Sequence, residues 1–162
     1  MKTITPRKIT LEDFARYGEY YVISEEFSEE EKNSPETFIL HKDVYTQKMG
    51  QAAVGYFNTY FLERDPVFHE MEKHDIGEES LLAIDSMVLV VAPPSDGPPL
   101  AETFEAFIVP ANTFIKYKVG VWHYAPCPVD TRYTRTLYYM PPYTFAYDDT
   151  MLEVPEKVRV EM

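Results

Sequence analysis

The sequence is poor in cysteine, in glycine and in basic residues. Its one cysteine, Cys127, excludes an internal disulfide. Six glycines beside thirteen prolines indicate many short connections between strands rather than long helices. Fifteen lysines and arginines stand against 27 acidic residues, which gives a formal net charge of -12. That balance argues against a nucleic-acid or anionic-membrane partner, because both need basic patches.

Long hydrophobic runs are also missing. A membrane span needs roughly 20 apolar residues, and the sequence has no such run and no signal-peptide core after Met1. These absences predict a cytoplasmic protein that binds neither membranes nor nucleic acid. A small anionic substrate would have to be attracted by a local cation or metal, against the negative field of the whole chain.

Length and composition favour one packed domain. The 162 residues are 45% hydrophobic and 15% aromatic, a composition typical of a globular chain rather than a disordered one. We expect a single domain over residues 1–162. It divides into 1–35, with a helix, a strand and an acidic loop, then 36–142, which holds the main strands, and 143–162, a C-terminal arm.

Most of the chain has the pattern of short strands. Residues 9–18 predict one short helix, with Thr10 as its N-cap and Gly18 as its end. Downstream, β-branched and aromatic segments alternate with Gly, Pro, Asn and Asp, which is typical of an all-β sandwich or barrel. An exposed loop is expected at 24–35, and either a short helix or an arm on a neighbouring subunit at 143–162. The expected strands are 20–23, 37–45, 53–61, 67–73, 80–92, 103–109, 114–121 and 133–140.

The clearest cluster of ionisable residues lies on the strand expected at 67–73. Side chains alternate along a strand, so Glu70, Glu72 and His74 would share one face. Buried ionisable groups are rarely left unpaired. The cluster therefore predicts a divalent metal site or a proton-transfer centre, with Glu70 either orienting a ligand or exposed at the rim.

Two residues outside this strand complete the expected site. Glu79 would follow just beyond a turn at Gly77, and His123 would arrive from another strand. Two imidazoles and two carboxylates suit Zn, Mn, Ni or Fe(II). The alternative is that these are ordinary surface residues of an acidic protein, although histidine is scarce. The four histidines are His41, His69, His74 and His123.

The segment before His123 predicts a pocket wall. Alternation counted back from His123 places Val119 and Tyr117 inward and Lys116 outward. The wall would be apolar, with the Tyr117 hydroxyl available to bind a substrate. An aromatic residue that only fills the core is the alternative.

Two arginines lie near the last long strand. Arg132 and Arg135 have opposite parity, so only one of them can point inward. Arg135 is our candidate for binding a substrate carboxylate through two parallel hydrogen bonds. An ion pair with a nearby acidic residue is the alternative.

The spacing of the candidate ligands resembles a known pattern. Glu72-x-His74-x4-Glu79, followed by Gly120-x-x-His123, is similar to the two metal motifs of cupins. In those motifs a histidine usually stands where this chain has Glu72.

A narrower resemblance covers most of the chain. Three segments look like the ureidoglycolate lyase family of small cupins, and a fourth looks like the N-terminal signature of that family. The chain departs from the pattern at Glu79, where glutamine is common, and at Tyr124, where a second histidine often occurs. The four segments are Glu72–Gly77, Val88–Pro93, Gly120–His123 and Ile9–Gly18.

This resemblance implies a fold and an assembly. The fold is an all-β cupin jelly-roll barrel of two antiparallel sheets, with one short N-terminal helix and the site inside. Cupins often pair, so a homodimer formed through an edge strand or an exchanged arm is expected.

The resemblance also implies an activity. Ureidoglycolate would be cleaved to glyoxylate and urea in allantoin and purine breakdown. Glu72, His74 and His123 would be catalytic, with Glu72 or His123 as the base. Glu72, His74, Glu79 and His123 would hold any metal, and the family leaves its presence open. The alternatives are a metal-dependent cupin isomerase, epimerase or dioxygenase acting on another small hydroxy acid or sugar, and a non-enzymatic cupin that binds a small metabolite.

Overall fold

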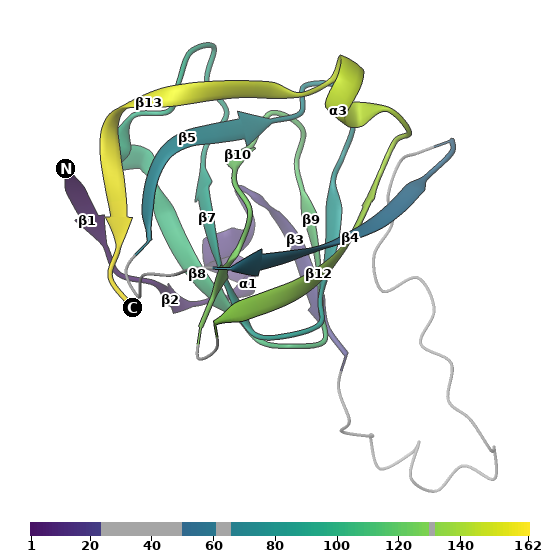
Figure 1. Cartoon of the computed structure of the whole chain (residues 1–162), viewed down its shortest axis with the longest axis horizontal. Coiled ribbons are helices and arrows are strands. Elements are labelled where there is room, and N and C mark those ends of the chain that lie inside the picture. The colour runs from purple at the N-terminus through teal and green to yellow at the C-terminus, as the bar shows by residue number, and fades with distance from the viewer. Residues whose placement is uncertain (24–49, 61–65, 130–131) are drawn as a thin grey trace, which may run out of the picture.

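The computed structural model describes residues 1–23, 50–60, 66–129 and 132–162. The strand expected at 37–45 and the loop expected at 24–35 lie outside this part of the chain. Figure 1 shows the strands curled around a common interior. The structure confirms the expected all-β, cupin-like barrel. In the described ranges no helix is both long and apolar enough to cross a membrane.

Two sheets form the barrel. The pairings are antiparallel except β1 with β13 and β2 with β8, which are parallel. This corrects the expectation of purely antiparallel sheets: the N-terminal strands join the two edges of the first sheet from a distant part of the chain, so no hairpin sets their direction. The first sheet has the order β1 (Lys2–Ile4), β13 (Thr150–Val160), β5 (Val67–Lys73), β10 (Trp122–His123), β7 (Met87–Ala92), β8 (Glu105–Val109) and β2 (Arg7–Lys8), with β11 (Cys127–Pro128) pairing with β7. The second has the order β3 (Gly18–Val22), β9 (Thr113–Tyr117), β6 (Ser80–Ala83), β12 (Tyr133–Met140) and β4 (Ala53–Tyr60).

The expected N-terminal helix is present but shorter. Helix α1 spans Leu11–Phe14, and the Thr10 hydroxyl caps it by accepting the Asp13 backbone N–H at 3.1 Å. Gly18 begins β3 rather than ending the helix. A Cβ at Gly18 would lie 1.9 Å from the Lys116 carbonyl oxygen, so this close approach of two backbones requires glycine.

One expected strand is split in two, and another is shorter than expected. The segment 80–92 forms β6 and β7, which belong to different sheets. In the segment 114–121, strand β9 ends at Tyr117, and a turn then leads to β10 in the other sheet. The turn brings the Val121 N–H to the Lys118 carbonyl. It also breaks the alternation counted back from His123, so Val119 is 41% exposed rather than inward.

Two apolar clusters pack against the two faces of the first sheet. Every residue of β7 is buried, because Leu89 and its same-face neighbours enter the barrel core whereas Val90 and its neighbours enter a second cluster on the outer face. That outer cluster includes Trp122 of β10 and Val158 of β13. A strand buried on both faces explains the unbroken apolar run at 87–92.

The C-terminal segment joins the barrel of its own chain. A single-turn helix, α3 (Thr144–Tyr147), comes first, and a 3-10 turn, η1 (Ala101–Thr103), lies elsewhere in the chain. Strand β13 then pairs antiparallel with β5, with Met151 opposite Glu72. Figure 1 shows this yellow strand beside β5. The segment predicted as a helix or an arm is therefore a helix followed by a strand of the same sheet.

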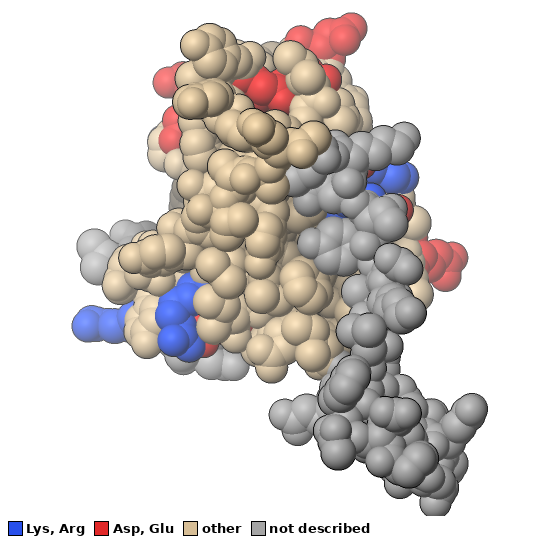
Figure 2. Space-filling model, turned by 90° about the vertical axis from the view of Figure 1, so that its right-hand side faces the viewer, with Lys and Arg blue, Asp and Glu red and all other residues tan. Residues whose placement is uncertain are grey.

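Strand β4 lies at the edge of the second sheet. Its only neighbour among the described strands is β12. Val54, Tyr56 and Tyr60 point outward and are 61%, 72% and 66% exposed. Figure 2 faces this side and shows a largely uncharged described surface. The homodimer stays a prediction.

Candidate active site

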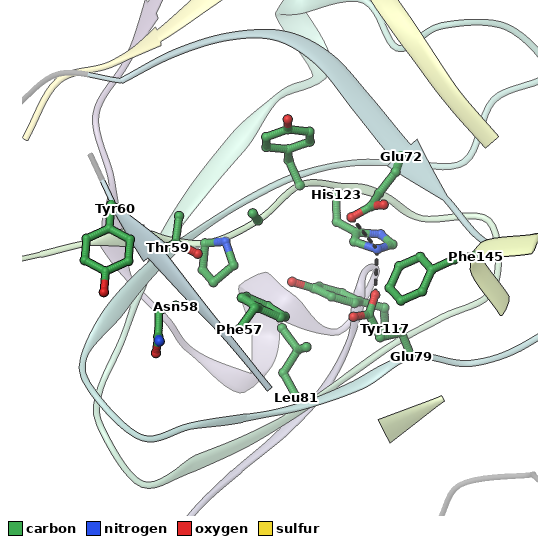
Figure 3. A pocket seen from close by; sticks show the side chains of 13 residues that line it. Phe57, Asn58, Thr59, Tyr60, Glu72, Glu79, Leu81, Tyr117, His123 and Phe145 are labelled. Atoms are coloured by element: carbon green, nitrogen blue, oxygen red, sulfur yellow. Dashed lines mark ion pairs between the residues drawn. The ribbon is translucent and has the colours of Figure 1, made fainter. Parts of the chain in front are cut away.

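A cavity of about 410 Å³ opens inside the barrel. Its walls come from both sheets, from the segment after His123 and from α3 (Figure 3). Most of the wall is aromatic or apolar. Its acidic and imidazole side chains are Glu72 of β5, Glu79 just before β6, and His123 of β10.

Three of the expected ligands meet beside the cavity, and two of them, Glu79 and His123, form part of its wall. The Glu79 Oε2 atom lies 2.8 Å from His123 Nε2 and 3.5 Å from His74 Nε2. All three donor atoms lie within 4.8 Å of one another, and none of the three residues is more than 7% exposed. Segments about fifty residues apart in the sequence thus form one compact centre.

Glu72 lies beside this centre rather than within it. It pairs in register with His123 across β5 and β10, and its Oε1 atom is 4.0 Å from His123 Nε2. Figure 3 shows its carboxylate on the cavity wall next to His123. Glu72 therefore faces the cavity without belonging to the three-atom group.

Each imidazole has its Nδ1 atom against a backbone carbonyl, an arrangement that suits metal binding through Nε2. His74 Nδ1 lies 2.6 Å from the Asp148 carbonyl and His123 Nδ1 lies 2.9 Å from the Val121 carbonyl. A ring that donates from Nδ1 leaves a lone pair on Nε2, the usual arrangement of a metal-binding histidine. Both Nε2 atoms and Glu79 Oε2 are buried, and beyond their ion-pair contacts with one another they have no hydrogen-bond partner among the described residues. The three residues therefore fit a divalent ion such as Zn, Mn, Ni or Fe(II).

The same contacts shift the pKa values of the centre in opposite directions. Burial opposes the charge on Glu79, but His123 and His74 outweigh it and hold the Glu79 pKa at about 2. Burial likewise opposes the charge on His74, but Glu79 and the Asp148 carbonyl raise its pKa to about 9. The pKa of His123 is also raised, mainly by Glu79 against the effect of burial. Burial raises the pKa of Glu72.

These shifts predict a pH window of stability for metal-free protein. Lowering the Glu79 pKa from 4.5 to about 2 stabilises the fold above pH 4.5, and this is lost as the pH falls through 2. Raising the His74 pKa from 6.5 to about 9 stabilises it below pH 6.5, and this is lost as the pH rises through 9. In chelator-treated protein we expect Tm to be highest between pH 4.5 and 6.5 and to fall by about 5 °C by pH 9.

Differential scanning calorimetry from pH 3 to 10 measures this window. The variant Glu79→Gln removes the anion that both imidazoles contact, so its Tm should not show the fall between pH 6.5 and 9. A Tm of the wild-type chain that rises over this interval would contradict the assignment.

A backbone contact joins the two motifs. The Gly120 N–H donates to the His74 carbonyl at 2.7 Å. Gly120 adopts a φ of 79°, a left-handed conformation that side chains disfavour, and the turn it forms leads into β10, which carries His123. The glycine of the second motif therefore has a structural role, because its turn brings His123 beside His74.

Asp148 fixes the first motif from the C-terminal segment. Its carboxylate accepts backbone N–H groups of Asp75, Ile76 and Gly77 at 2.7–3.2 Å, while its carbonyl accepts from His74 Nδ1. A Cβ at Gly77 would lie 2.7 Å from a Pro141 ring carbon, so this turn packs closely against the segment that follows β12. Sequence reasoning missed Asp148, because 74 residues separate it from His74 and no motif signals the contact.

Replacing Asp148 with alanine should loosen the turn that carries His74. Three backbone N–H groups lose a charged acceptor, which we expect to cost about 1–3 kcal/mol of unfolding free energy and to weaken metal binding about tenfold. Urea denaturation and equilibrium dialysis with Zn²⁺ measure the two effects. Asp149→Ala, at the exposed neighbouring position, is the matched control and should change neither. Equal effects in both variants would contradict the proposed contact.

The remaining predicted site residues divide between the pocket and the surface. Tyr117 lines the cavity, and its ring stacks on that of His123 with centroids 4.5 Å apart. His69 is exposed on the outer side, and His41 lies outside the described residues.

Arg135 does not reach the pocket, which corrects the prediction that it binds substrate. Its guanidinium binds the two oxygens of Asp85, each at 2.8 Å, and its side chain is 50% exposed. Alternation along β12 sends Thr134 and Thr136 inward and Arg135 outward. Arg132 is exposed as well. No lysine or arginine of the described part lines the cavity.

Comparison with known proteins gives a consistent family. Residues 1–140 match the family model described as ureidoglycolate lyase. The ureidoglycolate lyases of Stutzerimonas stutzeri and Pseudomonas fluorescens are each 28% identical to this chain over 138 residues, which is 82% of the chain and 79% and 81% of those proteins. A protein of Agrobacterium fabrum that carries the same name provisionally is 28% identical over 134 residues, 80% of the chain and 77% of its own length. The match over residues 1–140, which contain all four expected ligands, shows that the chain belongs to the ureidoglycolate lyase family.

Proposed function

We propose that this enzyme cleaves ureidoglycolate to glyoxylate and urea. The observation that carries the proposal is the placing of one carboxylate, Glu72, and one histidine, His123, side by side on the wall of a small cavity. The family match and the names of the relatives support the same reaction.

The reaction needs one proton to move. The carbinol O–H loses its proton, its electrons form the aldehyde C=O, the carbon–nitrogen bond breaks, and the departing nitrogen gains a proton. No oxidant or second substrate is required. A base that can accept a proton near neutral pH and return it a short distance away satisfies the balance.

Glu72 suits the role of that base. Its carboxylate faces the cavity and is free of the three-atom centre. Burial raises its pKa, which brings its proton affinity closer to the working pH. After taking the hydroxyl proton, the Glu72 carboxyl is the acid that returns it to the urea nitrogen.

The centre behind Glu72 supplies the positive charge for the substrate carboxylate. Because no described lysine or arginine lines the cavity, attraction of an anion depends on His123 and its partners. His74, Glu79 and His123 would hold a divalent metal. When bound, such an ion would supply Lewis-acid polarisation of substrate oxygens. The substrate carboxylate would lie at this centre, next to Glu72.

Urea release from racemic ureidoglycolate by purified protein tests the proposal. We expect turnover well above the spontaneous rate, assayed before and after chelator treatment and after return of Zn²⁺, Mn²⁺, Ni²⁺ or Fe²⁺. A rate equal to the spontaneous background under all of these conditions would overturn it. That result would favour another cupin reaction on a small hydroxy acid or sugar.

A further inference from the structure

Hydroxyl groups mark the end of the cavity away from the His74–Glu79–His123 centre. Figure 3 shows Thr59 at that end and the Tyr117 ring extending from near Glu79 toward Phe57. Both Thr59 and Tyr117 line the cavity. Thr134 of β12 is directly opposite Thr59 of β4 in the register of the second sheet, and it points inward because it is fully buried between two exposed neighbours.

These three hydroxyls share an unusual property. Thr59 Oγ1, Thr134 Oγ1 and the Tyr117 hydroxyl are all buried, and none has a hydrogen-bond partner in the protein. Tyr117 is only 2% exposed. Buried hydroxyls without partners are costly, so a ligand that supplies their hydrogen bonds gains affinity.

The chemistry at this end selects a neutral polar group. The neighbouring wall is formed by Phe57, Leu81 and Pro126, and no charged described residue lines it. A carboxylate placed there would lose water without gaining a cation. Each hydroxyl can both donate and accept, which matches a group with a carbonyl oxygen and N–H donors.

We propose that Thr59 and Tyr117, which line the cavity, form a subsite for the ureido group of the substrate, with Thr134 opposite Thr59 on the neighbouring strand. This inference rests on the proposed function and extends it by fixing the direction of the substrate. The carboxylate and hydroxyl face His123 and Glu72, and the urea that departs lies against the hydroxyls of Thr59 and Tyr117. The breaking carbon–nitrogen bond then lies between the two ends of the cavity.

Two unreactive ligands test the two ends of the cavity independently. Hydantoate has the carboxylate and the ureido group of ureidoglycolate but no hydroxyl, so it cannot release urea. Glycolate has the carboxylate and hydroxyl but no ureido group. Titration calorimetry of the full chain gives the affinity for each. In Thr59→Val/Thr134→Val, and separately in Tyr117→Phe, hydantoate should bind about tenfold more weakly, whereas glycolate binding should be unchanged.

A neighbouring threonine provides the control. Thr136 is equally buried on the same strand face, but its hydroxyl contacts Met87 Sδ at 3.7 Å. Thr136→Val should leave both affinities unchanged, and Tm measured on every variant detects a general loss of packing. Unchanged hydantoate affinity in the double variant, or equal loss of both ligands, would overturn the subsite. Wild-type protein that binds hydantoate selectively but releases no urea would retain the subsite and reject the lyase reaction.

Discussion

Replacing His123 with alanine is expected to lower urea release from ureidoglycolate about a thousandfold. His123 contacts Glu79 at 2.8 Å, lies 4.0 Å from Glu72 and stacks on Tyr117, so its loss removes a group that faces substrate and disturbs three neighbours. Positioned acid–base groups and the ligands that orient them contribute effects of this size. Steady-state kinetics on the purified variant provides the measurement.

The control for this variant is another histidine. His69→Ala, at an exposed position on β5, should retain activity within about twofold, since surface changes rarely alter function. His123→Ala leaves Glu79 with one imidazole partner, so Tm is measured alongside kcat, and His123→Gln tests a side chain that still fills part of the space. Wild-type rates in both His123 variants would contradict a role for this residue in the reaction.

The second prediction with a large effect distinguishes the role of Glu79 in metal binding from the role of Glu72 in catalysis. Glu79→Ala removes the carboxylate that both imidazoles approach, and we expect affinity for Zn²⁺ or Mn²⁺ to fall about a hundredfold or more. Glu72→Gln should leave metal affinity within a few-fold and reduce kcat at least about a hundredfold, because an amide cannot accept the hydroxyl proton.

Equilibrium dialysis and steady-state kinetics on both variants measure this difference, and each variant is the control for the other. An equal loss of metal affinity in Glu72→Gln would show that Glu72 is a fourth ligand. Normal turnover in Glu72→Gln would show that the base is another group.

The strands and the ionisable residues could be read from local patterns. Alternation along residues 67–73 predicted that Glu72 faces the interior, and the scarcity of histidine singled out His74 and His123. Thr10 was predicted as the cap of the first helix, and the structure shows it in that role. These features depend on a side-chain period or on neighbours a few residues away, and such information is contained in the sequence itself.

Corners of the barrel could not be predicted in this way. The segments 80–92 and 114–121 have the composition of continuous strands, yet the first changes sheet between β6 and β7, and the second leaves β9 for a turn toward the other sheet. Counting parity through such a corner gave the wrong side for Val119. Hydrophobicity reports that a residue is buried, but it does not report against which sheet. The ion pair of Arg135 with Asp85 depends on the same corner, because Asp85 lies between β6 and β7.

By itself, the sequence determined an acidic all-β chain with two imidazoles and two carboxylates set for one site. Only the tertiary structure decided that Glu79, and not Glu72, completes the three-atom centre, and that Asp148 holds His74 in place. It also decided that buried hydroxyls, rather than an arginine, line the far end of the cavity. The physical reason is that these contacts join residues from separate strands, whose distances are set by how the two sheets close rather than by any local period.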